Sequence, residues 1–270
     1  MSQPEDICLL RHDGSGKNAF KNPLSFRYLD DNFIESDAVK IGKTFMDYLK
    51  KTKDPRIHVY CSLKDGNTEF DKQFGLPNGY DSHTIADAPS GSFVGLENTS
   101  NFNINTILRL DAPTIFLMPS ETKLLLAEAV LRNWTNGNAE VLYKEAITSS
   151  MKEQEIAYGT QGKITDEEIE TYLAQNLLST ANNTEKLQII GEQYWVATFI
   201  NGYESYANWR RTGYPKLIPT NYSGSMSPGV IPTRLPYPTD EYSINRANVD
   251  TANQQQGADK VTTHIWWDID

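Results

Sequence analysis

Cysteine and long apolar runs are both scarce in this chain, and each shortage excludes a class of protein. The two cysteines, Cys8 and Cys61, lack CxxC spacing and no histidine cluster accompanies them, so neither a metal site nor a redox pair is indicated. One disulfide between them stays open, although we expect two unrelated buried thiols. No run of about eighteen apolar residues occurs, so no segment is predicted to span a membrane.

Basic residues are also in the minority. The chain carries 25 Lys and Arg against 35 Asp and Glu, a formal charge of −10. Nucleic acid and anionic membranes both attract basic patches, so neither partner is favoured. An acidic surface is compatible with uncharged ligands such as oligosaccharides. Tyr (14), Phe (10) and Trp (5) are plentiful while apolar residues total 39%, which indicates an aromatic-rich globular protein with long ordered loops.

The motifs of common catalytic sites are missing. HExxH and GxSxG do not occur, and Gly14-x-Gly16-Lys17 is only a fragment of a phosphate loop. No histidines are paired at metal-ligand spacing, so we predict no metal, no cofactor and no catalytic residue. The carboxylate pair of a glycosidase is the remaining catalytic candidate, and we expect its acids to be solvated in polar loops. These acids are Asp71, Asp81, Asp87 and Glu97.

Helical periodicity dominates residues 36–53 and 119–212. In the first segment Ser36 is the expected N-cap, and Asp54-Pro55 ends the helix before a short strand at 57–63. Residues 119–154 predict two antiparallel helices, with Ser120 as the N-cap of the first. This αα-hairpin resembles a tetratricopeptide repeat, which cannot bury its apolar face alone and must stack on neighbours.

Two further helices are predicted after the hairpin. The first runs from Thr165 to about Leu178, and the second is a single long amphipathic helix from near residue 184 to residue 212. Tyr203 lies on the predicted apolar stripe of the long helix, and Gly213 is its expected left-handed cap. We expect the aromatic side chains of this helix to be buried on two sides; stacking on a ligand is the alternative.

The remaining segments carry few helix signals. Glycine and proline punctuate residues 64–111, which predicts a loop excursion packed on the core. Repeated prolines in residues 213–270 forbid long helices there. We expect this tail to be an extended strap whose Trp266 and Trp267 are buried against the helical layer, and a ligand platform is the alternative.

Three phrases in the second half of the chain resemble one protein family. They are FINGYESYANWRRTGYP (199–215), IPTRLPYPTDEYSINRANV (231–249) and the terminal WWD (266–268). Together they are similar to the SusD/RagB family, surface lipoproteins of Bacteroidota that capture nutrients, mostly glycans, for a TonB-dependent outer-membrane transporter. The resemblance covers residues 113–270 well and 36–63 loosely, and GLPNGYDS also resembles a turn of the family.

The resemblance implies a mainly α fold of tetratricopeptide-like hairpins with long irregular loops and a Pro-rich C-terminal strap. Family members are about twice this long and carry a signal peptide and a lipidated cysteine. The first residues here match neither feature, so we expect residues 1–270 to be the C-terminal portion of one longer SusD-like domain. The implied location is the outer-membrane surface, with a lipid anchor on the missing part. The implied partners are an oligosaccharide and a TonB-dependent transporter.

Sugar recognition uses aromatic faces together with amide and carboxylate side chains. The loop excursion offers such residues, and we predict them as ligand contacts: Asn78, Tyr80, Asp81, Phe93, Asn101 and Phe102. Two other functions compete with glycan capture. One is a helical-repeat scaffold that binds a protein and no sugar, and the other is a carboxylate-dependent glycosidase. Titration with glycans and analysis of sugar products distinguish the three.

Overall fold

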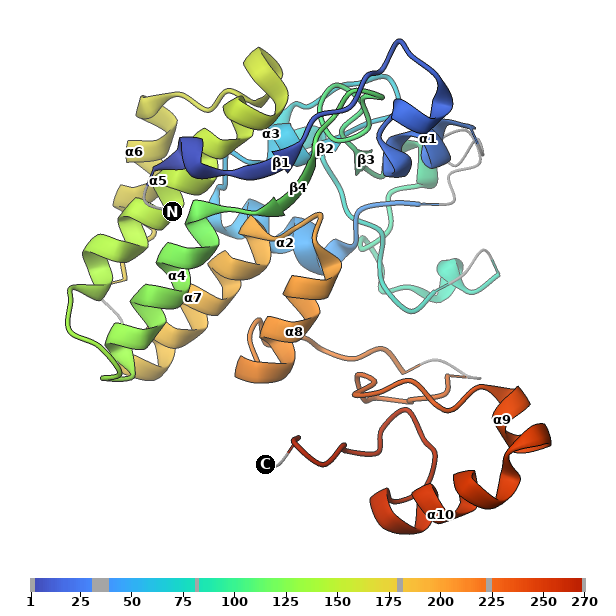
Figure 1. Cartoon of the computed structure of the whole chain (residues 1–270). Coiled ribbons are helices and arrows are strands. Elements are labelled where there is room, and N and C mark those ends of the chain that lie inside the picture. The colour runs from blue at the N-terminus through green and yellow to red at the C-terminus, as the bar shows by residue number, and fades with distance from the viewer. Residues whose placement is uncertain (1–2, 31–38, 81–82, 179–181, 222–224, 269–270) are drawn as a thin grey trace. The chain divides into compact units, whose positions relative to one another are not determined.

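Helices make up most of the regular structure, and the chain divides into two compact units. The computed structural model describes residues 3–30, 39–80, 83–178, 182–221 and 225–268 (Figure 1). The larger unit comprises residues 1–78 and 84–215, and the smaller unit comprises 79–83 and 216–270. The mainly helical fold with repeat-like hairpins, expected from the sequence, is confirmed.

The predicted αα-hairpin is present in the larger unit. It consists of α4 (Pro119–Leu131) and α5 (Ala139–Tyr158), and α7 (Asn183–Ala197) packs against α4 (Figure 1). The Asn138 side chain caps α5 by accepting a hydrogen bond from the backbone N–H of Val141. The next predicted helix is also confirmed, because α6 (Asp166–Gln175) begins at a capping box formed by Thr165 and Glu168.

Ser120 is not the N-cap of α4, so this part of the prediction is wrong. Met118 is the cap, and Pro119 occupies the first helical position. The Ser120 hydroxyl instead donates to the Glu153 carboxylate at 2.6 Å, and the Ser120 backbone N–H donates to it at 2.9 Å. Both residues are 0% exposed. A buried carboxylate must be hydrogen-bonded, and Ser120 on α4 supplies two such bonds to Glu153 on α5.

The single long helix predicted from residue 184 to residue 212 is two helices. α7 ends at Ala197, and α8 (Gly202–Thr212) begins four residues after Thr198. The Thr198 hydroxyl donates to the carbonyl of Tyr194 at 2.8 Å, and the Asn201 side chain accepts from the N–H of Glu204 and caps the new helix. The predicted end is confirmed, since Gly213 adopts a left-handed conformation with φ of 70°.

A close approach between α7 and the chain after α8 depends on a glycine. A Cβ atom at Gly191 would lie 2.6 Å from the Cβ of Tyr214. No side chain fits in that space, so Gly191 forms a notch in α7 into which Tyr214 packs.

The first hundred residues form short elements. α1 (Pro23–Asp30), α2 (Lys43–Thr52) and α3 (Ile57–Tyr60) are helical, whereas Ser36 lies outside the described residues. The strand predicted at 57–63 is therefore mostly wrong, since only β2 (Cys61–Ser62) is extended. The cause is local, because the Asp54 carboxylate accepts from the N–H of Arg56 and folds the chain into a turn that α3 continues.

Two short antiparallel sheets accompany the helices. β1 (Cys8–Leu10) pairs with β4 (Thr114–Leu117), and β2 pairs with β3 (Asn101–Phe102). The described part of 64–111 contains no α-helix, which agrees with the predicted excursion. Single 3-10 turns occur through the chain: Pro4–Asp6, Asn18–Phe20, Phe70–Lys72, Ile85–Asp87, Leu96–Asn98 and Gly159–Gly162.

Aromatic rings fill the core between α2 and α7. Phe45 stacks on Phe199 with ring centroids 4.3 Å apart and an interplanar angle of 7°, and it meets Trp195 edge-on at 5.0 Å. Tyr194 on α7 is 4% exposed. The predicted burial of these rings is thus confirmed for α7 and for the turn that follows it, and each contributes packing as well as ring–ring attraction.

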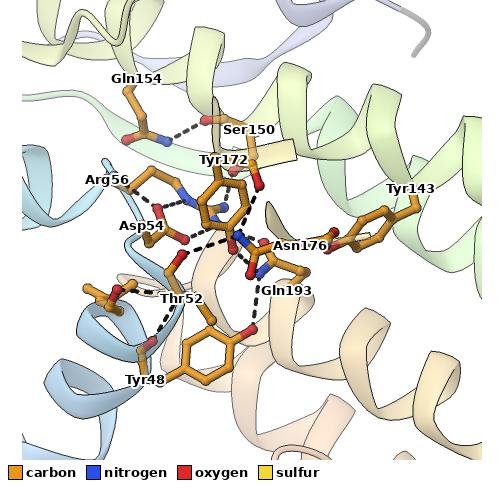
Figure 2. A network of polar contacts seen from close by, with 11 residues as sticks. Tyr48, Thr52, Asp54, Arg56, Tyr143, Ser150, Gln154, Tyr172, Asn176 and Gln193 are labelled. Carbon is orange, nitrogen blue, oxygen red and sulfur yellow. Dashed lines mark hydrogen bonds and ion pairs between the residues drawn. The ribbon is translucent and has the colours of Figure 1, made fainter. Parts of the chain in front are cut away.

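The core also contains an ion pair with 0% exposure of both side chains, Arg56 with Asp54. Arg56 Nε donates to Asp54 Oδ1 at 2.9 Å, Nη1 to Ser150 at 3.0 Å and Nη2 to Gln193 Oε1 at 2.7 Å. Gln193 then donates to the Tyr172 hydroxyl at 2.7 Å. Figure 2 shows that this network joins α5, α6 and α7 to the turn before α3.

The smaller unit contains α9 (Thr239–Ile244) and α10 (Arg246–Gln256). Asp259 organises it by accepting hydrogen bonds from Arg234 Nη2 at 2.8 Å, from the Tyr242 hydroxyl at 2.7 Å and from the Tyr237 N–H at 3.1 Å. Trp266 is 87% exposed, and the burial of Trp266 and Trp267 against the helical layer stays a prediction. Within this unit, the hydrogen bonds to Asp259 hold the segment together.

The two thiols differ in environment. Cys8 is exposed and Cys61 is buried, and both are free, so the expectation of two buried thiols is wrong for Cys8. Burial raises the pKa of the Cys61 thiol, which keeps it protonated and unreactive.

Within the described residues, none of the helices combines the length and the apolarity that crossing a lipid bilayer requires.

Replacing Arg56 with alanine is expected to lower the free energy of unfolding by about 3–5 kcal/mol, because it leaves the buried carboxylate of Asp54 without its counter-ion. Urea unfolding measures this loss. Asp47→Ala is the matched control, since it breaks the exposed ion pair with Lys43 and should cost about 0–1 kcal/mol. Equal losses in the two variants would contradict the role of the buried pair.

Candidate aromatic groove

A groove with a volume of about 790 Å³ opens on the larger unit beside α8. One wall is β4 with the residue before it, another is the start of α1, and the third is the α7–α8 turn with the first part of α8. The residues that line it are Asn22, Pro23, Leu24, Pro113, Thr114, Ile115, Phe116, Ile200, Asn201, Gly202, Tyr203 and Tyr206.

Aromatic side chains stand exposed at this groove. Tyr203 is 91% exposed, Phe116 is 58% exposed and Tyr206 is 41% exposed. Tyr206 is supported from behind, because its ring stacks on that of Trp209 with centroids 6.0 Å apart and an interplanar angle of 20°. Large exposed rings at the edge of a concave surface are the usual means of binding flat, partly apolar ligands.

Asn22, Thr114 and Asn201, polar residues of the groove, already have hydrogen-bond partners within the protein. Asn22 Nδ2 donates to the carbonyl of Ala112 at 2.8 Å, and Thr114 Oγ1 is 2.9 Å from His12 Nε2. Asn201 caps α8. These bonds fix the walls. No acidic, basic, histidine or cysteine side chain is among the described lining residues, so the groove offers mainly aromatic, aliphatic and amide contact surface.

An ion pair joins the C-terminal end of α8 to α4. Arg211 makes a two-pronged contact with Glu128, with both N–O distances at 2.7 Å, and Arg132 approaches the same carboxylate at 2.7 Å. Burial raises the pKa of Glu128, but the two arginines outweigh it and hold that pKa below its ordinary value. A paired, half-desolvated carboxylate of this kind positions the helix firmly.

The N-terminal end of α8 meets a cluster of acids. The Tyr194 hydroxyl donates to Glu204 at 3.3 Å, and Glu121 on α4 is 2% exposed. Burial raises the pKa of Glu121 to about 7, and the charges of Glu204 and Glu153 add to the rise. Glu121 Oε1 accepts from the N–H of Met118 at 3.1 Å. Protonation of Glu121 on α4 therefore removes a charge that repels Glu204 on α8.

The residues predicted as ligand contacts from the sequence fall in different environments. Asn78 is exposed and Phe93 is half-buried, both in the larger unit. Tyr80 is half-buried in the smaller unit, and Asp81 lies outside the described residues. Asn101 is 1% exposed.

Phe102 is part of the aromatic core. Its ring lies 5.7 Å from that of Tyr28 and 5.5 Å from that of Phe199. Asn101 and Phe102 are placed there because β3 pairs with β2, which runs beneath the surface. The predicted contacts therefore do not form one cluster within the larger unit. Whether any of them touches a sugar stays a prediction.

The acids considered for a glycosidase are exposed where the structure describes them, namely Asp71, Asp87 and Glu97. This agrees with their expected solvation. Across the described ranges, no three His, Cys, Asp or Glu side chains gather as a cation site would require.

The groove was not found from the sequence, and Tyr203 shows why. Tyr203 was placed on the buried stripe of one continuous helix, and its 91% exposure contradicts that placement. The break between α7 and α8 resets the helical phase, so the stripe does not continue across it. The usable signal was Asn201-Gly202, a cap residue followed by glycine in the middle of the predicted helix.

Comparison with known proteins identifies the family. A profile of the SusD-like family, described as starch-binding and associating with the outer membrane, matches residues 2–238, and the chain belongs to this family. No curated protein sequence matches the chain.

Solved structures share the fold. One, described as a chitin-binding protein, has 28% identity and a TM-score of 0.76, and the match covers 100% of this chain and 57% of that one. A Bacteroidetes SusD-like protein has 23% identity and a TM-score of 0.80, with 100% and 63% covered. A chitin-binding SusD homologue from Flavobacterium johnsoniae has 23% identity and a TM-score of 0.74, with 100% and 56% covered. The chain thus spans less than two thirds of the length of these relatives.

Glu121→Gln is expected to flatten the dependence of stability on pH. Because the pKa of Glu121 in the folded protein, about 7, exceeds its ordinary value of 4.5, the folded state keeps a proton that the unfolded state releases in this range. The free energy of unfolding should therefore fall as the pH rises through this range, by on the order of 1–2 kcal/mol once solvent screening is allowed for.

Urea unfolding of both proteins at pH 5 and pH 8 measures this contribution. Glu153 is present in both proteins, so the difference between them reports Glu121 together with its interaction with Glu153. An unchanged difference between the two pH values in Glu121→Gln would show that another group causes it.

Proposed function

We propose that this chain is part of a non-enzymatic protein that captures neutral oligosaccharides at the outer-membrane surface and delivers them to a TonB-dependent transporter. The observation that carries the proposal is the pairing of exposed aromatic rings with a groove whose described lining residues include no Asp, Glu, His, Cys, Lys or Arg, in a chain of the SusD-like family. The acidic net charge of −10 is compatible with an uncharged ligand.

The groove supplies the contacts that a pyranose ring needs. One face of such a ring carries axial C–H groups, which pack on the faces of Tyr203, Tyr206 and Phe116, while its hydroxyl groups remain in water or bond to the tyrosine hydroxyls. Aromatic contacts contribute about 0.5–1.5 kcal/mol each beyond the area they bury. Three rings around one groove are therefore enough for weak, reversible binding, which suits a protein that must release its ligand to a transporter.

The transporter partner and the lipid-anchored location follow from the family resemblance. In this proposal the helical-repeat surface docks on the transporter and a lipid anchor holds the protein at the membrane surface. The starch-binding description of the family and the chitin-binding relative with 28% identity make glucose and N-acetylglucosamine oligomers the first ligands to test.

The loop residues predicted from the sequence are a second set of proposed contacts. Asn78 is exposed and Phe93 is half-buried, so we propose them ahead of Asn101, which is buried, and ahead of Phe102, whose ring packs in the aromatic core. Tyr80 and Asp81 complete the set.

The double variant Tyr203→Ala, Tyr206→Ala is expected to weaken binding of chito- or malto-oligosaccharides about tenfold, because two stacking contacts are lost. Isothermal titration of the full chain measures this change. Trp134→Ala is the matched control, since Trp134 is 70% exposed at the far end of α4 and should not affect binding.

Flat titrations with every neutral oligosaccharide, together with capture of a protein partner, would favour the helical-repeat scaffold instead. Chromatography of the sugars after incubation supplies a separate check, since shortened products would identify a glycosidase.

Phe93→Ala tests the loop set independently, and we expect it to weaken the same titration about threefold if the loop meets the ligand. Phe20→Ala removes a ring that is 56% exposed elsewhere and serves as its control. Unchanged affinity in Phe93→Ala would remove the loop from the proposed site and leave the groove in place.

A further inference from the structure

A smaller cavity, with a volume of about 290 Å³, opens among α2, α5, α7 and the end of α6. It shares no lining residue with the aromatic groove. Its walls include the side chains of Tyr48, Tyr143, Gln175, Asn176, Ile189 and Glu192. Residues from four helices thus converge on one small space.

The floor of this cavity is part of the buried network around Arg56. Gln193 Nε2 donates to the Tyr48 hydroxyl at 3.1 Å, while Gln193 Oε1 accepts from Arg56 Nη2 at 2.7 Å (Figure 2). Arg56 itself is 0% exposed. Because every polar atom of the Gln193 side chain has a partner, the floor is rigid before any ligand arrives, and ordering it costs a ligand nothing.

The polar groups on the walls are mostly hydrogen-bond acceptors. The Asn176 nitrogen donates to the carbonyls of Tyr172 at 2.9 Å and Thr52 at 3.2 Å, which leaves the amide oxygen of Asn176 to accept from a ligand. Glu192 accepts from Gln188 Nε2 at 2.7 Å and is also hydrogen-bonded to the Tyr48 side chain, and the remaining lone pairs of the carboxylate can accept from a ligand. Gln175 lies exposed at the rim and adds an amide that both donates and accepts.

Charge and size restrict the ligand. No lysine or arginine lines the cavity, which disfavours anions, and Glu192 is the one acid among its lining residues, too few for a divalent cation. Burial raises the pKa of Glu192. A volume near 290 Å³ lies at the lower limit of about 300 Å³ for ligand pockets and suits one sugar ring rather than an oligomer.

We propose that this cavity binds a single uncharged, hydroxyl-rich ring, of the size of one hexose or N-acetylhexosamine. The half-buried ring of Tyr48 offers apolar surface to its C–H groups, and Glu192 and Asn176 accept from its hydroxyl groups. The site is separate from the groove and does not depend on oligosaccharide binding there. A bound ring would contact α2, α5, α6 and α7 together, so it should also stabilise the helical body.

Titration with free glucose and free N-acetylglucosamine tests the proposal, with binding followed by calorimetry and by the rise in melting temperature. Glu192→Ala removes a wall acceptor, and Gln175→Trp places a large ring at the exposed rim without disturbing the core. We expect each change to weaken binding at least tenfold. Glu170→Ala, an exposed acid on the same helix as Gln175, should bind as the unchanged protein does.

The groove variant Tyr203→Ala, Tyr206→Ala distinguishes the two sites. Unchanged monosaccharide binding in that variant, with loss in Gln175→Trp, supports the cavity. The reverse pattern overturns it and leaves the groove as the sugar site. Absence of saturable binding at 50 mM of either sugar, or equal binding by all variants, also overturns the proposal without bearing on oligosaccharide capture.

Discussion

The buried ion pair between Arg56 and Asp54 is the constraint around which the larger unit is arranged. A guanidinium with no access to water needs a counter-ion and a hydrogen-bond acceptor for each remaining N–H. Asp54 supplies the charge from the neighbouring turn, and α5 and α7 supply Ser150 and Gln193. These helices cannot slide along one another without leaving one of those groups unpaired. The network thus helps to set the register of the helical stack, together with the Ser120–Glu153 and Arg211–Glu128 contacts, while the apolar contacts around them are less directional.

The groove follows from that register and from the break after α7. With α7 fixed by Gln193, the chain leaves the body at Thr198, and Asn201 starts α8 in a new direction. The C-terminal end of α8 then contacts α4, because Arg211 donates hydrogen bonds to Glu128. A helix held at both ends but separated from α7 by a turn presents its side chains to solvent rather than to the core. Tyr203 and Tyr206 are exposed for this reason, beside the strand β4.

The sequence was sufficient for the helical hairpin, for the capping box at Thr165 and for the left-handed Gly213, because each depends on neighbours within a few residues. Prediction from the sequence failed where a residue's position depends on a group that is distant in the sequence. Ser120 has the composition of a cap but bonds to Glu153 on another helix. Phe102 looks like a loop aromatic, yet strand pairing draws it into the core. The candidate site was missed for the same reason, since its walls come from three separate parts of the chain and meet only in the fold.

The notch at Gly191 has a consequence for how the chain can vary in length. Tyr214 reaches that notch only if the turn and helix between them contain the present number of residues. One residue added to or removed from α8 would rotate everything after it by about 100° and move it by about 1.5 Å along the helix axis, away from the notch. Insertions and deletions between these two positions are therefore excluded unless they come in compensating sets. Variation in chain length must instead fall in connections that lie outside the stretch from Gly191 to Tyr214.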